Sequence, residues 1–562
     1  MRGRFIIAAL LFTAQVLALT IGGSSRAQDA AEQAPAVTPS VPVAPPATPA
    51  AAPPLVTPQP ASLPSPPPAT EPQAAPAPTV DSAAPVDAVV AAICLKLAEP
   101  GWRKDANPDD LAALAAFYSE RTSGPLWMTE MGFSAKGQAA LFEIGKADDW
   151  GLSAASFELP PAGALPATPQ AQAIAEIKLD LAILKYARFA RGGRVNPSEL
   201  SDKLDQAPPL RDPNTVLTEI AAASAPDAYL QSLHPKHEQF VRLRQALLKA
   251  RGKSEDGTKP AGDERDIRRL IINMERWRWM PEDLGALYVW NNSPEFMLYV
   301  VKDGKTIYAD KTLVGTLKYA TPVFSADMKT IVFNPDWIAP PTVLVENLLP
   351  PLRDGNYSIL KIHKLSVSYQ GKPVDVSRID WGRVDIRNYT FTQKSGPENV
   401  LGKVKFLFPN KHTVYMHDTL AYRKKFFQKP MRAIGHDCVR MEKPDRFAEV
   451  LIAEDKGWPA SQVKDLWDKS DNGTVTLDHK IPVHMTYFTA VVDEKGKVAT
   501  YADLYGFDNK LALALFSNAT GFPEPPPDTT VPSTEEADAS GAVRRASVSN
   551  DIAGSLGGFA GD

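Results

Sequence analysis

The sequence predicts a multidomain α + β protein, in which a helical N-terminal domain precedes a mainly β C-terminal domain. Three observations predict this class. Apolar residues recur at helical spacing between about Pro108 and Leu248, short apolar runs bounded by Gly and Asp follow from Ala286, and a polar Gly/Lys-rich stretch separates the two regions. We therefore expect a helical domain at 88–262 and a mainly β domain at 263–522.

Residues 1–27 have the pattern of a bacterial secretory signal peptide. Arg2 and Arg4 precede an apolar run from Phe5 to Ile21, and the small residues Ser25 and Ala27 flank the expected cleavage site. The run is shorter than the roughly 20 apolar residues of a membrane anchor. We expect export to the periplasm with cleavage, and an uncleaved inner-membrane anchor is the alternative.

The two ends of the mature chain have the composition of disordered segments. Residues 28–87 consist mainly of Ala, Pro, Val, Thr and Ser, and residues 523–562 are rich in Pro, Ser, Glu, Ala and Gly. Such segments bury too little apolar surface to offset the entropy of the chain. The first predicts an extended linker and the second a disordered tail.

Charge and hydropathy exclude two classes of partner. The formal net charge of −4 and the isoelectric point near 6.1 give no sign of a basic surface for nucleic acid. No segment after the leader is long and apolar enough to span a bilayer. We therefore expect no nucleic-acid partner and no stable membrane span after cleavage.

Three helices of the predicted structure can be placed by periodicity. Their apolar positions are Leu111, Leu114, Ala115 and Tyr118; Ile174, Ile177, Leu181, Leu184 and Ala187; and Ile267, Leu270, Ile271, Met274 and Trp277. The second helix spans 171–190 and is expected to end at Gly192-Gly193.

Strands are predicted by apolar runs in the C-terminal half. The runs cover residues 286–290, 296–301, 306–309, 330–333, 403–408, 414–417 and 486–492. Asp303-Gly304 lies between two of them and predicts a hairpin. Between Pro340 and Thr390 the strand pattern stops, apart from a short helical run at 343–352. An insertion of this length, about 341–390, is typical of a functional lid.

Only two cysteines, Cys94 and Cys438, occur in a chain that is expected to meet an oxidising compartment. A disulfide between them is one interpretation. Against it, Cys94 lies in an apolar run that predicts a buried helix, whereas Cys438 lies in a polar loop. A thiol in such a loop favours chemistry over structure.

Two histidines are candidate bases for the Cys438 thiol. His436 is two residues away, so an extended segment would place both side chains on one face. His417 ends a predicted strand upstream, and pairing of that strand with the Cys438 segment would bring its imidazole to the thiol. A tight turn from Gly435 to Cys438 could supply N–H donors for an acyl oxyanion.

These residues resemble a known catalytic signature. His417-Asp418-Thr419, followed by Gly435-His436-Asp437-Cys438-Val439-Arg440, is similar to the motif of YkuD-type L,D-transpeptidases. Flanking segments resemble the larger YcbB-like branch, in which a helical scaffold domain precedes a catalytic domain with a capping insertion. These segments are Thr321-Pro322-Val323-Phe324, Asn334-Pro335-Asp336-Trp337, Gly396-Pro397-Glu398-Asn399, Pro125-Leu126-Trp127 and Gly193-Arg194-Val195-Asn196-Pro197.

The resemblance implies roles for individual residues. Cys438 would be the nucleophile and His417 the general base, and Gly435, His436, Asp437 and Arg440 would shape the loop and its oxyanion hole. Arg440 would organise the loop or face a substrate carboxylate. Trp337, Tyr389, Asp418 and Thr419 are candidate substrate contacts. No cofactor and no metal is implied.

Two positions depart from the family pattern. Asp437 stands where the family has Gly before the nucleophile, and Gly435 stands where it has Ser or Thr. Either the oxyanion geometry differs from that of the family, or Asp437 adopts a left-handed conformation. The short linker before residue 262 also leaves no room for the peptidoglycan-binding domain that the branch often carries.

The implied reaction is a peptidoglycan 3-3 cross-link between stem peptides, formed through a cysteine thioester, with carbapenems as covalent inhibitors. A protein amine as acceptor, hydrolysis by water, and a non-catalytic wall protein on the same fold are alternatives. A metal-dependent peptidase using His417, Asp418, His436 and His484 is a further alternative, although their spacing matches no common zinc motif.

Overall fold

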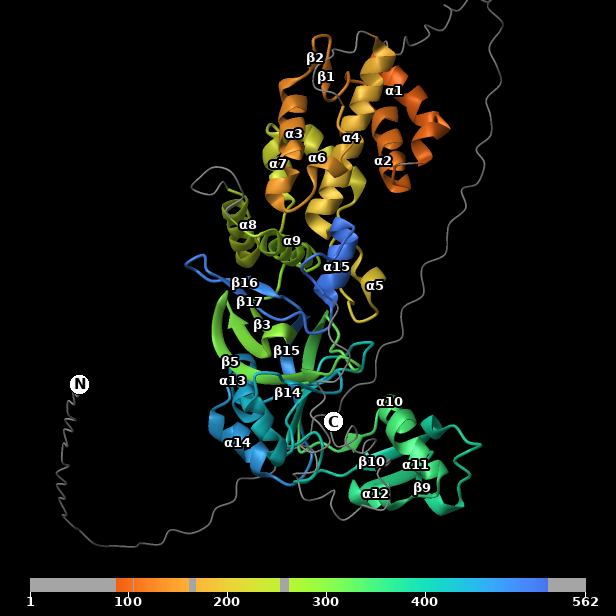
Figure 1. Ribbon diagram of the computed structural model, residues 1–562, viewed down its shortest axis with the longest axis vertical. Coiled ribbons are helices and arrows are strands. Elements are labelled where there is room, and N and C mark those ends of the chain that lie inside the picture. The colour runs from red at the N-terminus through yellow and green to blue at the C-terminus, as the bar shows by residue number, and fades with distance from the viewer. Residues whose placement is uncertain (1–86, 105, 161–167, 253–261, 524–562) are drawn as a thin grey trace, which may run out of the picture. The chain divides into compact units, whose positions relative to one another are not determined.

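The computed structural model describes residues 87–104, 106–160, 168–252 and 262–523 (Figure 1). The chain divides into two units, Met1–Val80 and Asp81–Asp562, and all described residues belong to the second. The predicted signal peptide, nearly all of the predicted linker and tail, and residues 253–261 before the predicted boundary lie outside the described residues.

The N-terminal domain is helical, as predicted. Its elements are α1 (Ala88–Ala98), α2 (Pro108–Ser119), β1 (Met128–Thr129), β2 (Gly132–Phe133), α3 (Ala135–Gly145), α4 (Pro169–Gly192), α5 (Pro197–Leu200), α6 (Pro213–Ala222), α7 (Pro226–Ser232) and α8 (Glu238–Arg251). Figure 1 shows α4 among α1, α2, α3, α6 and α7. No helix within the described residues has the length and apolar character needed to span a membrane.

The central helix α4 ends at the predicted glycines and begins at Pro169, slightly before the predicted start at residue 171. Thr168 accepts a hydrogen bond from the N–H of Ala171, Pro169 occupies the first turn, and Gly193 ends the helix at φ +85°. The predicted apolar faces are partly wrong, because Ile174 and Ala115 are exposed. The buried residues of α4 are spread around most of the helix, so a single apolar face does not describe its burial.

Two carboxylates of α4 are buried in the helical core. The hydroxyl of Tyr118 lies 2.9 Å from Glu176 and 2.7 Å from Asp180, and the indole N–H of Trp127 donates to Asp180 at 2.6 Å. The main-chain N–H of Trp127 donates to Glu176. Burial raises the pKa of both carboxyl groups, and the negative charge of Glu176 raises the pKa of Asp180 further.

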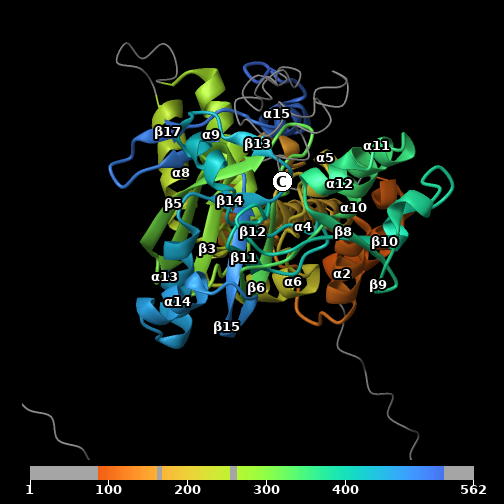
Figure 2. The same ribbon diagram turned by 90° about the horizontal axis from the view of Figure 1, so that it is seen from below.

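The C-terminal domain contains a closed β barrel. Its strands are β3 (Leu287–Asn292), β4 (Met297–Lys302), β5 (Lys305–Gly315), β6 (Phe324–Phe333), β11 (Val404–Leu407), β12 (Met416–His417), β13 (Ala433–Gly435), β14 (Val439–Met441) and β15 (Gly473–Thr486). The order is β13-β5-β14-β12-β11-β6-β15-β3-β4, and β4 also pairs with β5, which closes the ring. Figure 2 shows β14, β12 and β11 in succession.

Two turns of the barrel test the predicted strands. The hairpin at Asp303-Gly304 is confirmed, with positive φ at both residues as a type I′ turn requires. The single strand predicted at 486–492 is wrong, because β15 ends at Thr486 and β16 (Ala490–Val492) begins after a turn. In that turn the side chain of Asn292 bonds both the N–H and the carbonyl of Phe488, replacing the ladder bonds.

The barrel core is apolar, and two helices join it. Phe447 and Leu451 of α13 (Pro444–Lys456) and Val463 of α14 (Ala460–Asp468) belong to the same cluster as Phe406. Outside the barrel, α13, α14 and the insertion, the α-helices and strands of this domain are α9 (Glu264–Arg278), β16, β17 (Val498–Thr500) and α15 (Phe507–Phe516).

The insertion is more regular than the sequence predicts. It contains β7 (Trp337–Ile338), α10 (Pro341–Val343), the π-helical turn Leu344–Leu348, α11 (Leu349–Arg353), α12 (Ser358–Ile362), β8 (Leu365–Tyr369), β9 (Lys372–Pro373) and β10 (Tyr389–Gln393). The strands form a separate sheet in the order β7-β10-β8-β9. This capping subdomain has its own apolar cluster, which includes Trp337, Leu352 and Phe391.

Candidate active site

The segment that contains Cys438 crosses over the end of β5. The preceding strand β13 pairs with β5 in parallel, with Gly435 opposite Gly315, and the following strand β14 pairs with the other edge of β5, with Arg440 opposite Leu313. Residues 436–438 therefore join two strands that flank β5. Hydrogen bonds from Thr316 N–H to Gly435 O (2.9 Å) and from Val314 N–H to Arg432 O (3.0 Å) fix one side of this crossing.

Gly315 is required where the crossing segment passes. A Cβ atom at this position would overlap the carbonyl oxygen of Tyr319 and would lie 3.0 Å from that of His436. Main-chain atoms cannot move aside as a flexible side chain can, so a larger residue would displace the segment. The Gly315 N–H donates to Thr321 Oγ1 at 2.9 Å, which anchors the turn that follows β5.

The strand pairing brings His417 to the Cys438 segment. β12 pairs with β14 in parallel, with His417 opposite Arg440, and the N–H of Val439 donates to the carbonyl of Tyr415 at 3.3 Å. Side chains two residues apart share a face of an extended chain. Cys438 precedes Arg440 by two residues, so this register favours one face for the thiol, the guanidinium and the imidazole.

The buried imidazole of His417 is held in its neutral form. Its side chain is 2 % exposed, and burial lowers its pKa well below the usual value. The positive charge of Arg440 lowers this pKa further, while contacts with backbone groups of Asp418 and Leu401 act in the opposite direction. A neutral imidazole is the state that can accept a thiol proton.

Arg440 explains the glycine at position 435. The Arg440 side chain is 1 % exposed, and a Cβ atom at Gly435 would overlap its guanidinium nitrogen Nη1. The guanidinium therefore occupies the space that a Ser or Thr side chain would need. Of the two roles expected for Arg440, this packing favours organisation of the loop.

His436 is the nearer histidine in sequence, but its ring packs against another side chain. It stacks on Tyr319 with ring centroids 3.9 Å apart and planes at 12°. Burial lowers the pKa of His436 to about 4, against the opposing charge of the neighbouring Asp437. The Tyr319 hydroxyl donates to Glu346 of the capping subdomain at 2.5 Å, and Lys318 lies 2.8 Å from the same carboxylate.

The structure gives structural roles to several predicted substrate contacts. Asp418 is buried and accepts a hydrogen bond from the N–H of Lys403 at 3.0 Å. Thr419 is buried as well. Trp337 lies in the core of the capping subdomain, and the half-buried Tyr389 packs against Trp381.

One alternative for Asp437 and one expectation for Cys94 are corrected. Asp437 is not among the non-glycine residues with positive φ, so the left-handed conformation is not adopted. Cys94 lies in α1 as expected but is exposed rather than buried, because it falls on the outer face of the helix. Within the described residues Cys94 and Cys438 are not joined in a disulfide.

The histidines do not gather into a metal site in the described part of the chain, where no group of three or more His, Cys, Asp or Glu could hold an ion. His484 is engaged by protein partners at both ring nitrogens, by Ser325 Oγ at 2.8 Å and by the carbonyl of Leu284 at 3.0 Å.

Sequence patterns alone do not reveal the residues that support the loop. Gly315 and Tyr319 come from the end of β5 and the turn after it, Glu346 from the capping subdomain, and Tyr505, whose hydroxyl donates to the carbonyl of Gly315, from the segment after β15. None of them belongs to a motif with chemical meaning by itself. Only Gly315, a glycine at the end of an apolar strand, carries a local signal of close backbone approach.

Comparison with known proteins identifies both domains. The family model described as a scaffold domain matches residues 112–247, and the YkuD model, described as an L,D-transpeptidase catalytic domain, matches residues 286–484. A Haemophilus influenzae protein named "Putative L,D-transpeptidase" is 31% identical over 258 residues, which are 45% of this chain and 51% of that protein. The chain thus spans about half the length of this curated relative. The two matches, a scaffold domain followed by a YkuD-type L,D-transpeptidase catalytic domain, have the order of the YcbB-like architecture.

Proposed function

We propose that this protein is a periplasmic L,D-transpeptidase that forms 3-3 cross-links in peptidoglycan, with Cys438 as nucleophile and His417 as general base. The observation that carries the proposal is the parallel pairing of β12 with β14, which aligns His417 with Arg440 two residues beyond Cys438. The match of residues 286–484 to the catalytic domain supports the same reaction class.

The first half-reaction is an acyl transfer to the thiol. His417 takes the proton of Cys438, and the sulfur attacks the carbonyl at the L-centre of the third residue of a tetrapeptide stem. The tetrahedral intermediate collapses, the C–N bond to the terminal D-residue breaks, and the departing amine takes the proton from the imidazolium. A thioester remains on Cys438. General acid–base catalysis of this kind contributes roughly 10²–10⁴-fold.

The second half-reaction transfers the acyl group to an amine. The D-centre amine of a second stem attacks the thioester carbon, and His417 takes the amine proton. The C–S bond then breaks, and the imidazolium returns its proton to the departing sulfur, which regenerates the thiol. Backbone N–H groups of Asp437 and Cys438 are the proposed donors to the oxyanion in both steps. No metal or cofactor enters this scheme.

Partners and location follow from the same proposal. The substrates are stem peptides of peptidoglycan, and carbapenems are expected to acylate Cys438. The leader sequence at residues 1–27 supports export to the periplasm.

One assay tests the proposal. Purified protein is incubated with disaccharide-tetrapeptide, and products are identified by mass spectrometry. We expect a cross-linked dimer from the wild type and from Cys94→Ala, which removes the other thiol, and no dimer from Cys438→Ala. His417→Gln is expected to lower the rate by about 10²-fold or more.

The alternatives give different products in this assay. Release of the terminal residue without dimer indicates hydrolysis, and an adduct formed only when a protein amine is added indicates anchoring of that protein. Activity that survives Cys438→Ala would contradict the cysteine mechanism.

A further inference from the structure

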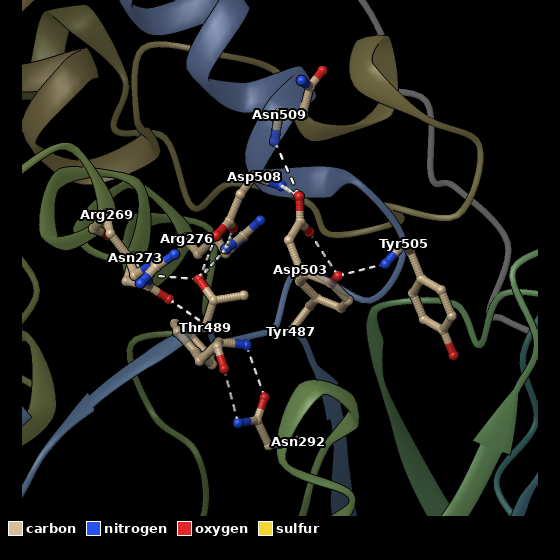
Figure 3. A network of polar contacts seen from close by, with 11 residues as sticks. Arg269, Asn273, Arg276, Asn292, Tyr487, Thr489, Asp503, Tyr505, Asp508 and Asn509 are labelled. Atoms are coloured by element: carbon tan, nitrogen blue, oxygen red, sulfur yellow. Dashed lines mark hydrogen bonds and ion pairs between the residues drawn. The ribbon is translucent and has the colours of Figure 1, made fainter. Parts of the chain in front are cut away.

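A buried polar network joins α9 to the segment that follows the barrel. Arg276 of α9 pairs with Asp508 at 2.5 Å, and the Thr489 hydroxyl donates to the same carboxylate at 2.8 Å. Asn273 accepts from the Thr489 N–H at 2.9 Å and donates to its hydroxyl at 3.0 Å. Figure 3 shows these side chains converging from α9 and from the residues after β15. All of them lie outside both family matches.

The network continues to Tyr505 through Asp503. Asp503 accepts hydrogen bonds from the Tyr487 hydroxyl at 2.7 Å and from the N–H groups of Asp508 and Asn509, at 3.0 and 3.2 Å, in the first turn of α15. The Tyr487 hydroxyl in turn accepts from the N–H of Tyr505 at 2.7 Å. The main chain of Tyr505 is therefore fixed at one end of the network.

The side chain of Tyr505 points away from the network, as Figure 3 shows, and its hydroxyl reaches the turn after β5. It donates to the carbonyl of Gly315 at 2.8 Å and accepts from the N–H of Thr321 at 3.3 Å. Tyr505 is 7 % exposed, so these main-chain groups have little access to water. Gly315 is the residue over which the Cys438 segment crosses.

We propose that Tyr505 is a positioning residue for Cys438: its hydroxyl fixes the Gly315 turn, and that turn sets the position of residues 435–438. The inference rests on the proposed function only in taking Cys438 as the nucleophile. The path has three links: Tyr505 Oη to Gly315, Gly315 against the carbonyl of His436, and Thr316 N–H to Gly435 O.

The electrostatics of Tyr505 agree with its place beside the crossing segment. Burial raises the pKa of Tyr505, hydrogen bonds with Thr321 oppose this, and the negative charge of Asp437 adds a smaller increase. Residue 437 precedes the nucleophile directly, so the hydroxyl and the crossing segment share one environment. Loss of the hydroxyl would leave a buried carbonyl and a buried N–H without this partner, and the turn would shift to recover hydrogen bonds.

The test compares two tyrosine substitutions in the full-length chain that already carries Cys94→Ala. Tyr505→Phe removes the hydroxyl and keeps the ring. Tyr299→Phe is the matched control. Tyr299 lies on β4, away from the crossing segment, and its hydroxyl donates to Glu295 at 2.6 Å. Three quantities are measured for each: kcat and KM for dimer formation, the pH profile of Cys438 alkylation by iodoacetamide, and the melting temperature.

For Tyr505→Phe we expect kcat to fall by about 10- to 100-fold, as expected for small displacements of a reacting group. KM is expected to stay within about twofold, since this hydroxyl does not bind substrate. The alkylation profile is expected to shift, while the melting temperature matches that of Tyr299→Phe. Equal kcat and equal alkylation profiles in the two variants would overturn the inference.

Two further variants complete the test. If Tyr505→Phe does not fold, Asp503→Asn replaces it, and an unchanged kcat and alkylation profile in that variant overturn the inference. Cys438→Ala separates the two proposals. Dimer formation that survives it refutes the proposed nucleophile, whereas loss of activity in Cys438→Ala with normal activity in Tyr505→Phe refutes the positioning role alone.

Discussion

At the scale of single residues, the sequence nominates candidates for the chemistry but says little about their packing. Cys438 stands out as a thiol in a polar loop, and the resemblance to the family signature, rather than the residues alone, favours His417 over His436 as its base. Gly435 could be read only as a departure from a family pattern. Its physical reason, the buried guanidinium of Arg440, depends on a side-chain position that no local pattern encodes.

Gly435→Ala is expected to reduce activity. The new Cβ would overlap Arg440 Nη1, and either the guanidinium or the loop must move. A displacement near 1 Å at the nucleophile costs on the order of 10²-fold in rate, which the dimer assay would detect. Gly145→Ala, at a helical position with open space around it, is the control and is expected to leave the rate unchanged. Full activity in Gly435→Ala would contradict this account of the loop.

We expect His417, as the proposed general base, to set the pH dependence of the proposed reaction. Its pKa is lowered in the folded protein, so the imidazole remains neutral as pH falls through 6.5. The acid limb of kcat/KM, which reports the free enzyme, is therefore expected well below pH 6.5. The same shift means that unfolding takes up protons below about pH 6.5, so the stability contribution of the neutral imidazole is lost as pH falls. An acid limb at or above pH 6.5 would exclude a buried, neutral base.

At the scale of secondary-structure elements, long periodic segments were predictable and short ones were not. α4 and α9 follow from repeated apolar positions and end signals. The sheet of the capping subdomain was missed, because its strands are short and their partners are distant in sequence: β10 pairs with β7 and β8. The break between β15 and β16 was missed because Asn292, almost two hundred residues earlier, supplies the bonds that replace the ladder.

The buried acids of α4 make the stability of the helical domain sensitive to rising pH. Tyr118 has one proton for two carboxylates, and the pKa of Asp180 is raised in the folded state. The folded state therefore holds a proton that the unfolded state releases. The stabilisation by this proton is greatest at pH values below the pKa of Asp180 in the unfolded chain. It is lost as the pH rises through the higher pKa of Asp180 in the folded protein.

Asp180→Asn is expected to remove this sensitivity. Its amide oxygen can still accept from Trp127, and its NH₂ group can donate to Tyr118. Within the window between the two pKa values, the unfolding free energies of wild type and variant should diverge by up to about 1.4 kcal/mol per pH unit. Thermal unfolding of the full chain at pH 5 and pH 8 measures this, with Asp227→Asn, at a half-buried position in the first turn of α7, as control. If the unfolding free energies of wild type and Asp180→Asn differ by the same amount at pH 5 and pH 8, Glu176 and Asp180 do not hold an extra proton in the folded state.

Glu346 links the capping subdomain to the turn that follows β5. Glu346 binds Lys318 and Tyr319, and Tyr319 stacks on His436. Glu346→Gln is expected to speed hydrogen exchange of residues 344–352, with less than about 1 kcal/mol lost in global stability because the ion pair is partly exposed. Glu398→Gln breaks an exposed ion pair with Lys364 and is the control. Unchanged hydrogen exchange of residues 344–352 in Glu346→Gln would show that the contacts of Glu346 do not restrain the capping subdomain.

At the scale of the whole molecule, the sequence predicted two domains but not the extent of contact between them. The segment around Leu204 forms a parallel bridge with Val323, and Asp205 lies 2.9 Å from His412 of the barrel. These contacts come from loops, whose pairing depends on tertiary placement rather than on local preference. The order of motifs was enough to identify the architecture, whereas the network around Tyr505 lies in segments that matched neither family model.

Residues beyond the family match are expected to be necessary for folding of the catalytic domain. Tyr487, Leu504, Tyr505 and Phe507 belong to the same apolar cluster as the barrel strands. Each large apolar side chain missing from this core removes about 1.5–3 kcal/mol of stabilisation. Several such losses together exceed the roughly 5–15 kcal/mol by which domains are stable.

The prediction is tested with two fragments. One contains residues 236–523, which retain α8, α9 and the segment after β15, and it is expected to show a cooperative thermal transition and alkylation of Cys438 with the pH profile of the full chain. The other is confined to residues 286–484 and lacks Tyr505 together with Tyr487, Leu504 and Phe507 of the barrel core. It is expected to unfold without a cooperative transition and to show an altered alkylation profile. A cooperative transition with the full-chain alkylation profile in the shorter fragment would show that the barrel positions Cys438 without support from α9 and the segment after β15.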